Sequence, residues 1–426
     1  MREEKGVDAA EKYMRAGYIF NMIALFINAS ESVVILSVAS RTVGNYDAGI
    51  LTIAFTIANL MMMVGKFGIR NYQVTDIKNK YSFISYKKAR YLTLVIMVLA
   101  TFSYITKGIL WGQYSFRKSL IIIGVTLLYV AETLEDVYWG EYQRQGRLDV
   151  GAKIFSARWL LTIINCCIWL VLTHNTILAV YSSVIVDWGA MVILLIISSR
   201  KLLNKKIENT CRDNLGFGAL LKECLPLAIN SVLYYYIVNA SKYAIDGVLP
   251  DDIQAFYGYV SMPIFVIGLL NSILYQPILL HIAQEWENCN LKALCNRIKK
   301  QSLIACGLTI VCIIGAWLIG IPVLSWLYGT DLQNYKAELI ILLLGGGWLA
   351  LANFFSTVLT TMRKLKLPLI TYTTVAILSL IFTKIAVKQY GTVGAATVNM
   401  IWTLLLATVF GMEVFIQIKK VRKRRK

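Results

Sequence analysis

Residues 224–250 read CLPLAINSVLYYYIVNASKYAIDGVLP, and this stretch decides how the rest of the chain is interpreted. It is long and apolar enough to cross a bilayer, because the hydrocarbon layer needs about 20 residues of apolar helix. It nevertheless carries polar and charged side chains, among them Asn239, Lys242 and Asp246. Such groups are costly inside a membrane and usually face a protein interior or a water-filled cavity.

Residues 17–41, GYIFNMIALFINASESVVILSVASR, have the same character, with Asn28 and Glu31 in mid-span. Both stretches contain the triplet Asn-Ala-Ser. Paired segments with polar interruptions are typical of transporters that are built from two internal repeats. We therefore predict that each stretch opens one half of a two-fold repeated membrane protein.

The composition supports this class of protein. Of 426 residues, 57% are hydrophobic and 16% are charged, and the mean hydropathy is +0.61. A soluble domain could not bury so much apolar surface, so the sequence predicts an all-α polytopic membrane protein. The net charge of +19 would suggest nucleic acid in a soluble protein, but the basic residues are scattered in short runs, and we expect no nucleic-acid partner.

Twelve apolar stretches are long enough to span a bilayer, and they form two groups of six. They lie near 17–40, 47–66, 89–107, 118–140, 154–173, 177–199, 224–246, 255–280, 302–328, 338–361, 367–387 and 391–416. We expect an N-terminal six-helix lobe over 1–200, a cytoplasmic linker over 201–222, and a C-terminal six-helix lobe with a basic cytoplasmic tail over 223–426. The two lobes should be related by a pseudo-two-fold axis.

The positions of the basic residues predict the topology. The termini and alternate loops hold 35 of the 43 Lys and Arg residues, and basic loops stay in the cytoplasm. Both termini are therefore predicted to be cytoplasmic. The loops assigned to the other side are no longer than about a dozen residues, which argues against a membrane sugar polymerase or ligase with a folded outer loop. Pro263 and Pro277 predict a bent eighth crossing.

Three carboxylates share one face of the fourth crossing, because Glu132, Glu135 and Asp136 follow an i, i+3, i+4 pattern. Arg158, near the inner end of the fifth crossing, is a candidate partner for them. Two interpretations stay open: a proton- or cation-linked acidic cluster, or a structural ion network. Glu31 and Asp187 lie deeper in their crossings, and the ion-coupling candidates are Glu31, Asp187 and Glu132.

Cations and amides supply candidates for substrate binding. Arg70 follows the second crossing, and a planar guanidinium suits diphosphate, whereas Lys242 supplies a movable point charge. A cavity position for Lys242 and a position at the outer interface both stay open. Tyr235 offers a ring for sugar stacking or for packing. His174 and His281 are isolated, and no catalytic or metal-ligand arrangement is evident, so we expect neither enzymatic activity nor a cofactor.

Three segments resemble a known family. They are GIRNYQVTD (68–76), VYWGEYQRQGRLDVGAK (137–153) and NASKYAIDGVLPDDIQAFYGYVSMP (239–263). With twelve crossings in two groups of six, the chain resembles the polysaccharide transporters. These are O-antigen and capsule-unit flippases of the multidrug/oligosaccharidyl-lipid/polysaccharide (MOP) exporter superfamily.

The resemblance implies a function and a location. An undecaprenyl-diphosphate-linked oligosaccharide would be turned from the inner to the outer leaflet of the bacterial cell membrane, through a cationic cavity between the lobes. Membrane lipids and other polysaccharide-assembly proteins are the further partners that it suggests. The candidates for substrate binding are Arg70, Arg158, Lys242, Asn28, Asn230, Asn239 and Tyr235. Two alternatives stay open: a cation-coupled small-molecule or drug antiporter of the same superfamily, and a membrane sugar polymerase or ligase.

Overall fold

A computed structural model describes residues 2–76, 79–202, 216–364 and 366–424. The described residues are helical, with short turns and an isolated β-bridge between Asp246 and Leu249. The chain divides into two compact units, Met1–Val232 and Leu233–Lys426. Most of the linker expected over 201–222 falls on residues 203–215, which lie outside the described part, as do the last two residues of the basic tail.

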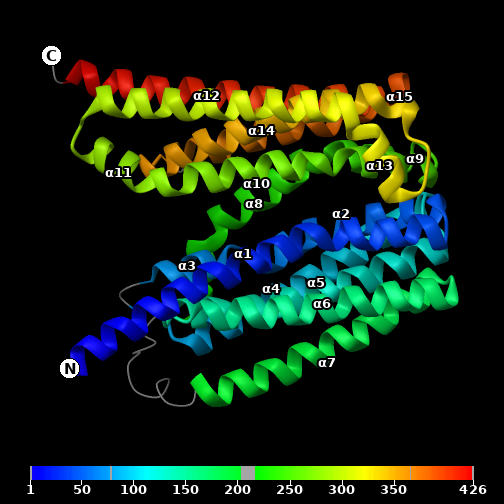
Figure 1. Cartoon of the computed structure of the whole chain (residues 1–426), viewed down its shortest axis with the longest axis horizontal. Coiled ribbons are helices and arrows are strands. Elements are labelled where there is room, and N and C mark those ends of the chain that lie inside the picture. Colours follow the sequence, from blue (N-terminus) through cyan, green and yellow to red (C-terminus); the bar gives the residue numbers. More distant parts are fainter. Residues whose placement is uncertain (1, 77–78, 203–215, 365, 425–426) are drawn as a thin grey trace. The chain divides into compact units, whose positions relative to one another are not determined.

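The N-terminal unit contains seven helices and the first half of an eighth (Figure 1). These are α1 (Arg2–Thr42), α2 (Asn45–Lys66), α3 (Ile69–Thr75), α4 (Phe83–Leu110), α5 (Phe116–Arg144), α6 (Leu148–Thr173), α7 (Thr176–Leu202) and α8 (Phe217–Ile245). α3 is a short helix between two membrane-length helices. The unit boundary at Val232 falls inside α8, so this helix belongs to both units.

The C-terminal unit contains the second half of α8 and the helices that follow it. These are α9 (Asp251–Ser261), α10 (Pro263–Tyr275), a 3-10 turn (Gln276–Ile278), α11 (Leu279–Glu287), α12 (Leu291–Gly315), a π-helical turn (Ala316–Gly320), α13 (Ile321–Tyr328), a 3-10 turn (Gln333–Tyr335), α14 (Lys336–Thr361) and α15 (Lys366–Arg424).

The predicted number of crossings is confirmed within the described residues. Ten helical segments there are long and apolar enough to span a membrane. One of them, α15, is two helices joined at Gly391, whose φ of 58° and ψ of −136° are not helical. α5 has a spanning length but carries more charges than the other spans. Counting α15 twice and adding α5 gives twelve crossings, so the chain is a multi-pass helical membrane protein.

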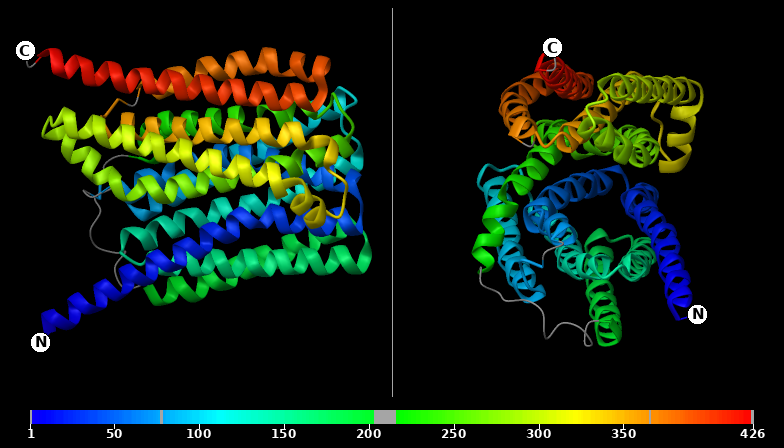
Figure 2. Two further views of the ribbon diagram at one scale, coloured as in Figure 1. Left: turned by 45° about the horizontal axis from the view of Figure 1, so that its top comes forward. Right: turned by 90° about the vertical axis from the view of Figure 1, so that its left-hand side faces the viewer.

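Each unit is built around one central helix. In the N-terminal unit α5 packs against α2, α4, α6 and α7. In the C-terminal unit α14 packs against α9, α10, α12 and α15. Figure 2 shows α14 and α15, drawn in orange and red, side by side. α5 is the fourth crossing and α14 is the tenth, so the two central helices are at equivalent places in the repeat. A side chain on either helix can therefore meet partners from several neighbours.

Breaks in the helices follow the sequence. The eighth crossing is interrupted before Pro263 and again at the turn that contains Pro277, as the two prolines predicted. The count of basic residues that predicted the topology included 292–300 as one of the cytoplasmic loops, but this segment forms the first turns of α12. A polar segment can form a helix in water when an N-cap residue precedes it. The charged side chains of this segment therefore fit a helix that begins outside the hydrocarbon layer. Asn290 provides this cap, accepting from the Ala293 amide at 3.3 Å.

Candidate functional site

The acidic face of α5 is buried in the N-terminal unit. The exposed fractions of Glu132, Glu135 and Asp136 are 4%, 2% and 6%. Their spacing directs them to one side of the helix, and α2, α4, α6 and α7 surround that helix. Three carboxylates on one buried face repel each other unless cations neutralise them. The surrounding helices supply these cations.

Arg158 on α6 neutralises the first part of this face. Its guanidinium is fully buried and donates through Nε to Glu135 Oε2 at 2.6 Å and through Nη1 to Asp187 Oδ1 at 2.5 Å. Its Nη2 lies 4.0 Å from Glu132 Oε2. The Thr162 hydroxyl also donates to Asp187, at 2.8 Å. Arg158 is therefore a partner of the acidic face, as the sequence suggested, and its Nε and Nη1 are hydrogen-bonded inside the unit, whereas Nη2 has no hydrogen-bond partner among the described residues.

Three further cations complete the network. Lys66 at the end of α2 lies 2.7 Å from Glu132 Oε1. Arg90 on α4 donates to Asp136 at 2.6 Å and to the Gly65 carbonyl at 2.7 Å. Arg70 on α3 lies 3.5 Å from the other oxygen of Asp136. Lys66, Arg70, Arg90 and Arg158 thus face the four carboxylates Glu132, Glu135, Asp136 and Asp187, and this part of the network carries no net formal charge.

Glu31 on α1 is the additional carboxylate beside this network. It is 4% exposed and, within the described part of the chain, forms no ion pair. The Tyr129 hydroxyl donates to Glu31 Oε1, and Asn59 donates to the Tyr129 oxygen at 3.1 Å. Glu31 Oε2 has no hydrogen-bond partner among the described residues. A buried carboxylate in this state is stabilised by binding a proton or a cation.

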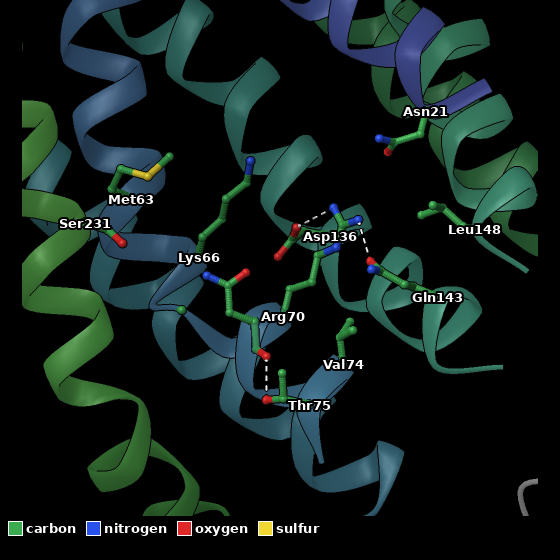
Figure 3. A pocket seen from close by; sticks show the side chains of 12 residues that line it. Asn21, Met63, Lys66, Arg70, Val74, Thr75, Asp136, Gln143, Leu148 and Ser231 are labelled. Atoms are coloured by element: carbon green, nitrogen blue, oxygen red, sulfur yellow. Dashed lines mark hydrogen bonds and ion pairs between the residues drawn. The ribbon is translucent and has the colours of Figure 1, made fainter. Parts of the chain in front are cut away.

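A cavity of about 620 Å³ opens beside the network (Figure 3). Its lining residues are Asn21, Met63, Lys66, Gly68, Arg70, Asn71, Val74, Thr75, Asp136, Gln143, Leu148 and Ser231. The side chains of Lys66 and Arg70 are 25% and 23% exposed, so they remain accessible from the cavity. Arg70 is held in place because it donates to Gln143 Oε1 at 2.9 Å and stacks 4.1 Å from the centre of the Trp139 ring.

The structure places the other predicted residues as follows. Asn28 is exposed on α1, and Asn230 is half-buried on α8 with an unpartnered Oδ1. Asn239 is half-buried and donates to the Tyr235 carbonyl at 3.1 Å.

Lys242 is half-buried and makes no ion pair among the described residues. Arg70 is on the cavity wall, whereas Arg158 lies in the ion network. The roles of these residues in binding stay predictions.

Two important cations were not singled out from the sequence. Lys66 is the last residue of α2 and Arg90 lies about two turns into α4, and the sequence assigned both charges to the topology of a basic loop. Glu132, Glu135, Asp136 and Asp187 together require more positive charge than Arg158 provides, and this imbalance is the signal that could have found them. Tyr129, which donates to Glu31, was not distinguishable from other aromatic residues of α5.

Comparisons with solved structures show which known fold this chain has. No protein-family model matches the sequence, and no curated protein matches it. Among solved structures, an inward-facing multidrug resistance MATE family transporter of the MOP superfamily has a TM-score of 0.67 and 12% identity, covering 96% of this chain and 99% of that chain. The bent form of the Vibrio cholerae MATE transporter VcmN has a TM-score of 0.63 and 10% identity, covering 97% and 98%.

A third solved structure differs in its described function. It is a MOP superfamily transporter from Pyrococcus furiosus, and its binding pocket of reverse polarity is said to suggest a different function. The TM-score is 0.55 and the identity 13%, covering 97% of both chains. The present chain therefore has the fold of the MATE transporters of the MOP superfamily. In its N-terminal unit this fold holds a balanced ion network, a carboxylate (Glu31) with no counter-ion among the described residues, and a cavity lined by two accessible cations.

Proposed function

We propose that this chain is a cation-coupled small-molecule exporter that works by alternating access. The similarity to multidrug resistance MATE transporters, over nearly the whole of both chains, supports this interpretation better than the lipid-linked flippase expected from the sequence. The observation that carries the coupling is the state of Glu31. It is buried beside a network whose charges already balance, and one of its oxygens has no partner among the described residues.

Glu31 would act by binding the coupling cation. Without a bound cation, the negative charge of Glu31 is buried, which costs free energy. A bound cation neutralises this charge. A ligand shifts a conformational equilibrium by its difference in affinity for the two states. A cation that binds Glu31 more tightly in one conformation would therefore favour that conformation. No covalent chemistry is involved, and transport would follow from this exchange.

The test uses the full chain in liposomes under an imposed proton or sodium gradient, with ethidium as the probe. Gradient-driven movement of the probe is expected with the native chain. Glu31→Gln should reduce this movement to the level of protein-free vesicles, because the neutral amide has no negative charge with which to bind a proton or a metal cation. Glu287→Gln is the matched control, since Glu287 is exposed on α11. Equal gradient-driven rates for Glu31→Gln and the native chain would contradict the coupling role.

A second candidate function is favoured by the charge of the cavity. Lys66 and Arg70 line it and are accessible, whereas neither Glu31 nor Asp187 is among its lining residues. Accessible Lys and Arg side chains suit a phosphate-bearing ligand. We propose on this ground that a polyprenyl-diphosphate-linked oligosaccharide is the competing substrate, moved from the inner to the outer leaflet of a bacterial cell membrane by a protein with cytoplasmic termini.

The same liposomes separate the two substrates. A labelled polyprenyl-diphosphate oligosaccharide is placed in the membrane, and its protection from an external modifying enzyme is followed. Transfer of this lipid above that of protein-free vesicles, without movement of ethidium, would favour the flippase. Movement of ethidium with no lipid transfer across several glycans would favour the small-molecule exporter.

A further inference from the structure

Arg70 carries the least compensated positive charge of the ion network. Its partner Asp136 is already bound by Arg90 at 2.6 Å, and Arg70 lies 3.5 Å from the other oxygen of this carboxylate. Elsewhere in the network, the single guanidinium of Arg158 is shared by two carboxylates. The local excess of positive charge is therefore at Arg70, which lines the cavity (Figure 3).

The helix that carries Arg70 cannot fix the direction of this side chain by itself. α3 has seven residues and follows a break at Phe67 and Gly68, whose φ angles of 50° and 67° are left-handed. A helix of this length is marginal alone, so its position depends on the surfaces that it packs against. For α3 these surfaces belong to α4 and α5.

Two neighbouring residues of α5 receive the Arg70 side chain. Gly140 lies under the aliphatic part, because a Cβ atom added there would be 3.2 Å from Arg70 Cγ and would overlap Gln73 Oε1. Trp139 lies under the guanidinium, whose carbon is 4.1 Å from the centre of the indole ring. The negative face of the ring attracts the cation. Gln143 Oε1 then accepts from the guanidinium at 2.9 Å and fixes its rotation.

The Trp139 ring is seated on α6, and its place there depends on a glycine. A Cβ atom added at Gly151 would lie only 2.6 Å from Trp139 Cγ, so any side chain at this position would displace the ring. Phe155, one turn later on the same face of α6, packs against the ring with centres 5.1 Å apart. The indole Nε1 has no hydrogen-bond partner among the described residues, so the ring is held by shape.

We propose that Trp139 and Gly151 are positioning residues for an oxyanion site at Arg70, and that the group bound there is a phosphate of the ligand. Trp139 orients the guanidinium, and Gly151 leaves room for the ring. A planar guanidinium can bind two phosphate oxygens at once, and a group that is already oriented loses less freedom on binding. The phosphate part rests on the phosphate-bearing ligand proposed above, whereas the orientation of Arg70 can be measured without a ligand.

The first experiment measures binding of inorganic diphosphate to the purified full chain in detergent, by calorimetry. Trp139→Leu keeps an apolar side chain but removes the ring, and should weaken binding roughly 3- to 30-fold through the loss of the cation–π contact. Trp139→Phe restores an aromatic face and should bind within about threefold of the native chain. Equal weakening in both variants, or none in Trp139→Leu, would overturn the role of the ring.

The role of Gly151 is tested by its coupling to Trp139. Gly151→Ala should weaken diphosphate binding, whereas Gly189→Ala, on α7 with open space around it, should leave binding unchanged. In Trp139→Leu, the further change Gly151→Ala should weaken binding by less than about twofold, because both substitutions act through the same ring. Losses that multiply in the double variant would overturn the assignment of Gly151.

A measurement without diphosphate separates the two parts of the proposal. Phenylglyoxal modifies accessible guanidinium groups, and mass spectrometry of the treated full chain gives the rate at Arg70. This rate should rise about threefold or more in Trp139→Leu and stay near the native rate in Trp139→Phe. That pattern in a native chain that binds no diphosphate would overturn the phosphate ligand alone. Equal rates in the native chain and Trp139→Leu would overturn the positioning role.

Discussion

Arg158 donates through Nη1 to the Asp187 carboxylate at 2.5 Å, and this ion pair joins α6 to α7 inside the N-terminal unit. Both side chains are fully buried. The same guanidinium reaches Glu135 on α5, so one side chain connects three helices. This connection makes Arg158 a structural element of the unit as well as a candidate for binding.

Arg158→Ala should destabilise the protein by about 3–5 kcal/mol, because removing one partner of a buried ion pair leaves uncompensated charge. The measurement is the melting temperature and the yield of folded protein in detergent. Arg422→Ala is the control, since Arg422 is exposed near the end of α15. An unchanged melting temperature in Arg158→Ala would be incompatible with the network described.

Arg70 and Arg90 both contact Asp136 but should respond differently to mutation. Arg90 is fully buried and also donates to the Gly65 carbonyl, so Arg90→Ala should lower the melting temperature and the folded yield. Arg70 is partly exposed on the cavity wall, so Arg70→Ala should preserve folding. If the cavity binds an anionic group, Arg70→Ala should weaken binding roughly 10- to 150-fold.

Binding and folding are measured on the same two variants. Binding is followed with a short-chain polyprenyl diphosphate and with inorganic diphosphate as probes. The opposite pattern, in which Arg70→Ala unfolds the protein and Arg90→Ala does not, would show that the two guanidinium groups have been assigned the wrong roles.

Gly347 allows α12 and α14 to approach closely. A methyl group added at Gly347 would overlap the Thr309 side chain. Gly347→Ala should therefore destabilise the protein by about 1–3 kcal/mol, through overpacking. Gly307 on α12 has open space around it, so Gly307→Ala is the matched control and should be neutral or stabilising. Equal melting temperatures for the two variants would contradict this packing.

Lys80 ties the start of α4 to α8 through its ion pair with Glu223. The hydrogen bond from Lys80 to Glu223 raises the pKa of the lysine. Because this pKa is raised in the folded state, the contribution to stability is full below the ordinary lysine pKa of about 10.4 and is lost only as the pH rises through the raised value. The difference in melting temperature between the native chain and Lys80→Met should thus be constant between about pH 6 and about pH 9.

Thermal unfolding at several pH values checks this expectation, with Lys87→Met as the control, since Lys87 also lies on this edge of α4 and forms no ion pair among the described residues. A difference that disappears as the pH rises toward about pH 9 would show that the pKa of Lys80 is lowered and not raised.

Much of the ion network was accessible from the sequence. The spacing of Glu132, Glu135 and Asp136 placed them on one face, and Arg158 was named as a partner, which its contacts with Glu132 and Glu135 confirm. The sequence did not decide whether these carboxylates form a proton- or cation-linked cluster or a structural ion network. The answer depended on Lys66 and Arg90, which are distant in sequence from the acidic residues and whose charges were counted as part of a basic loop.

The sequence by itself determined the twelve crossings and the two-fold arrangement, because hydrophobicity over a bilayer length is a local property that a run of residues carries alone. It also showed that Glu31 has an unusual position. Only the tertiary structure decided which carboxylates have counter-ions, since an ion pair joins residues from different helices. That balance leaves Glu31 and Glu338 without an ion-pair partner among the described residues, and the contact of Glu338 with Thr392 of the last helix gave no signal in the sequence.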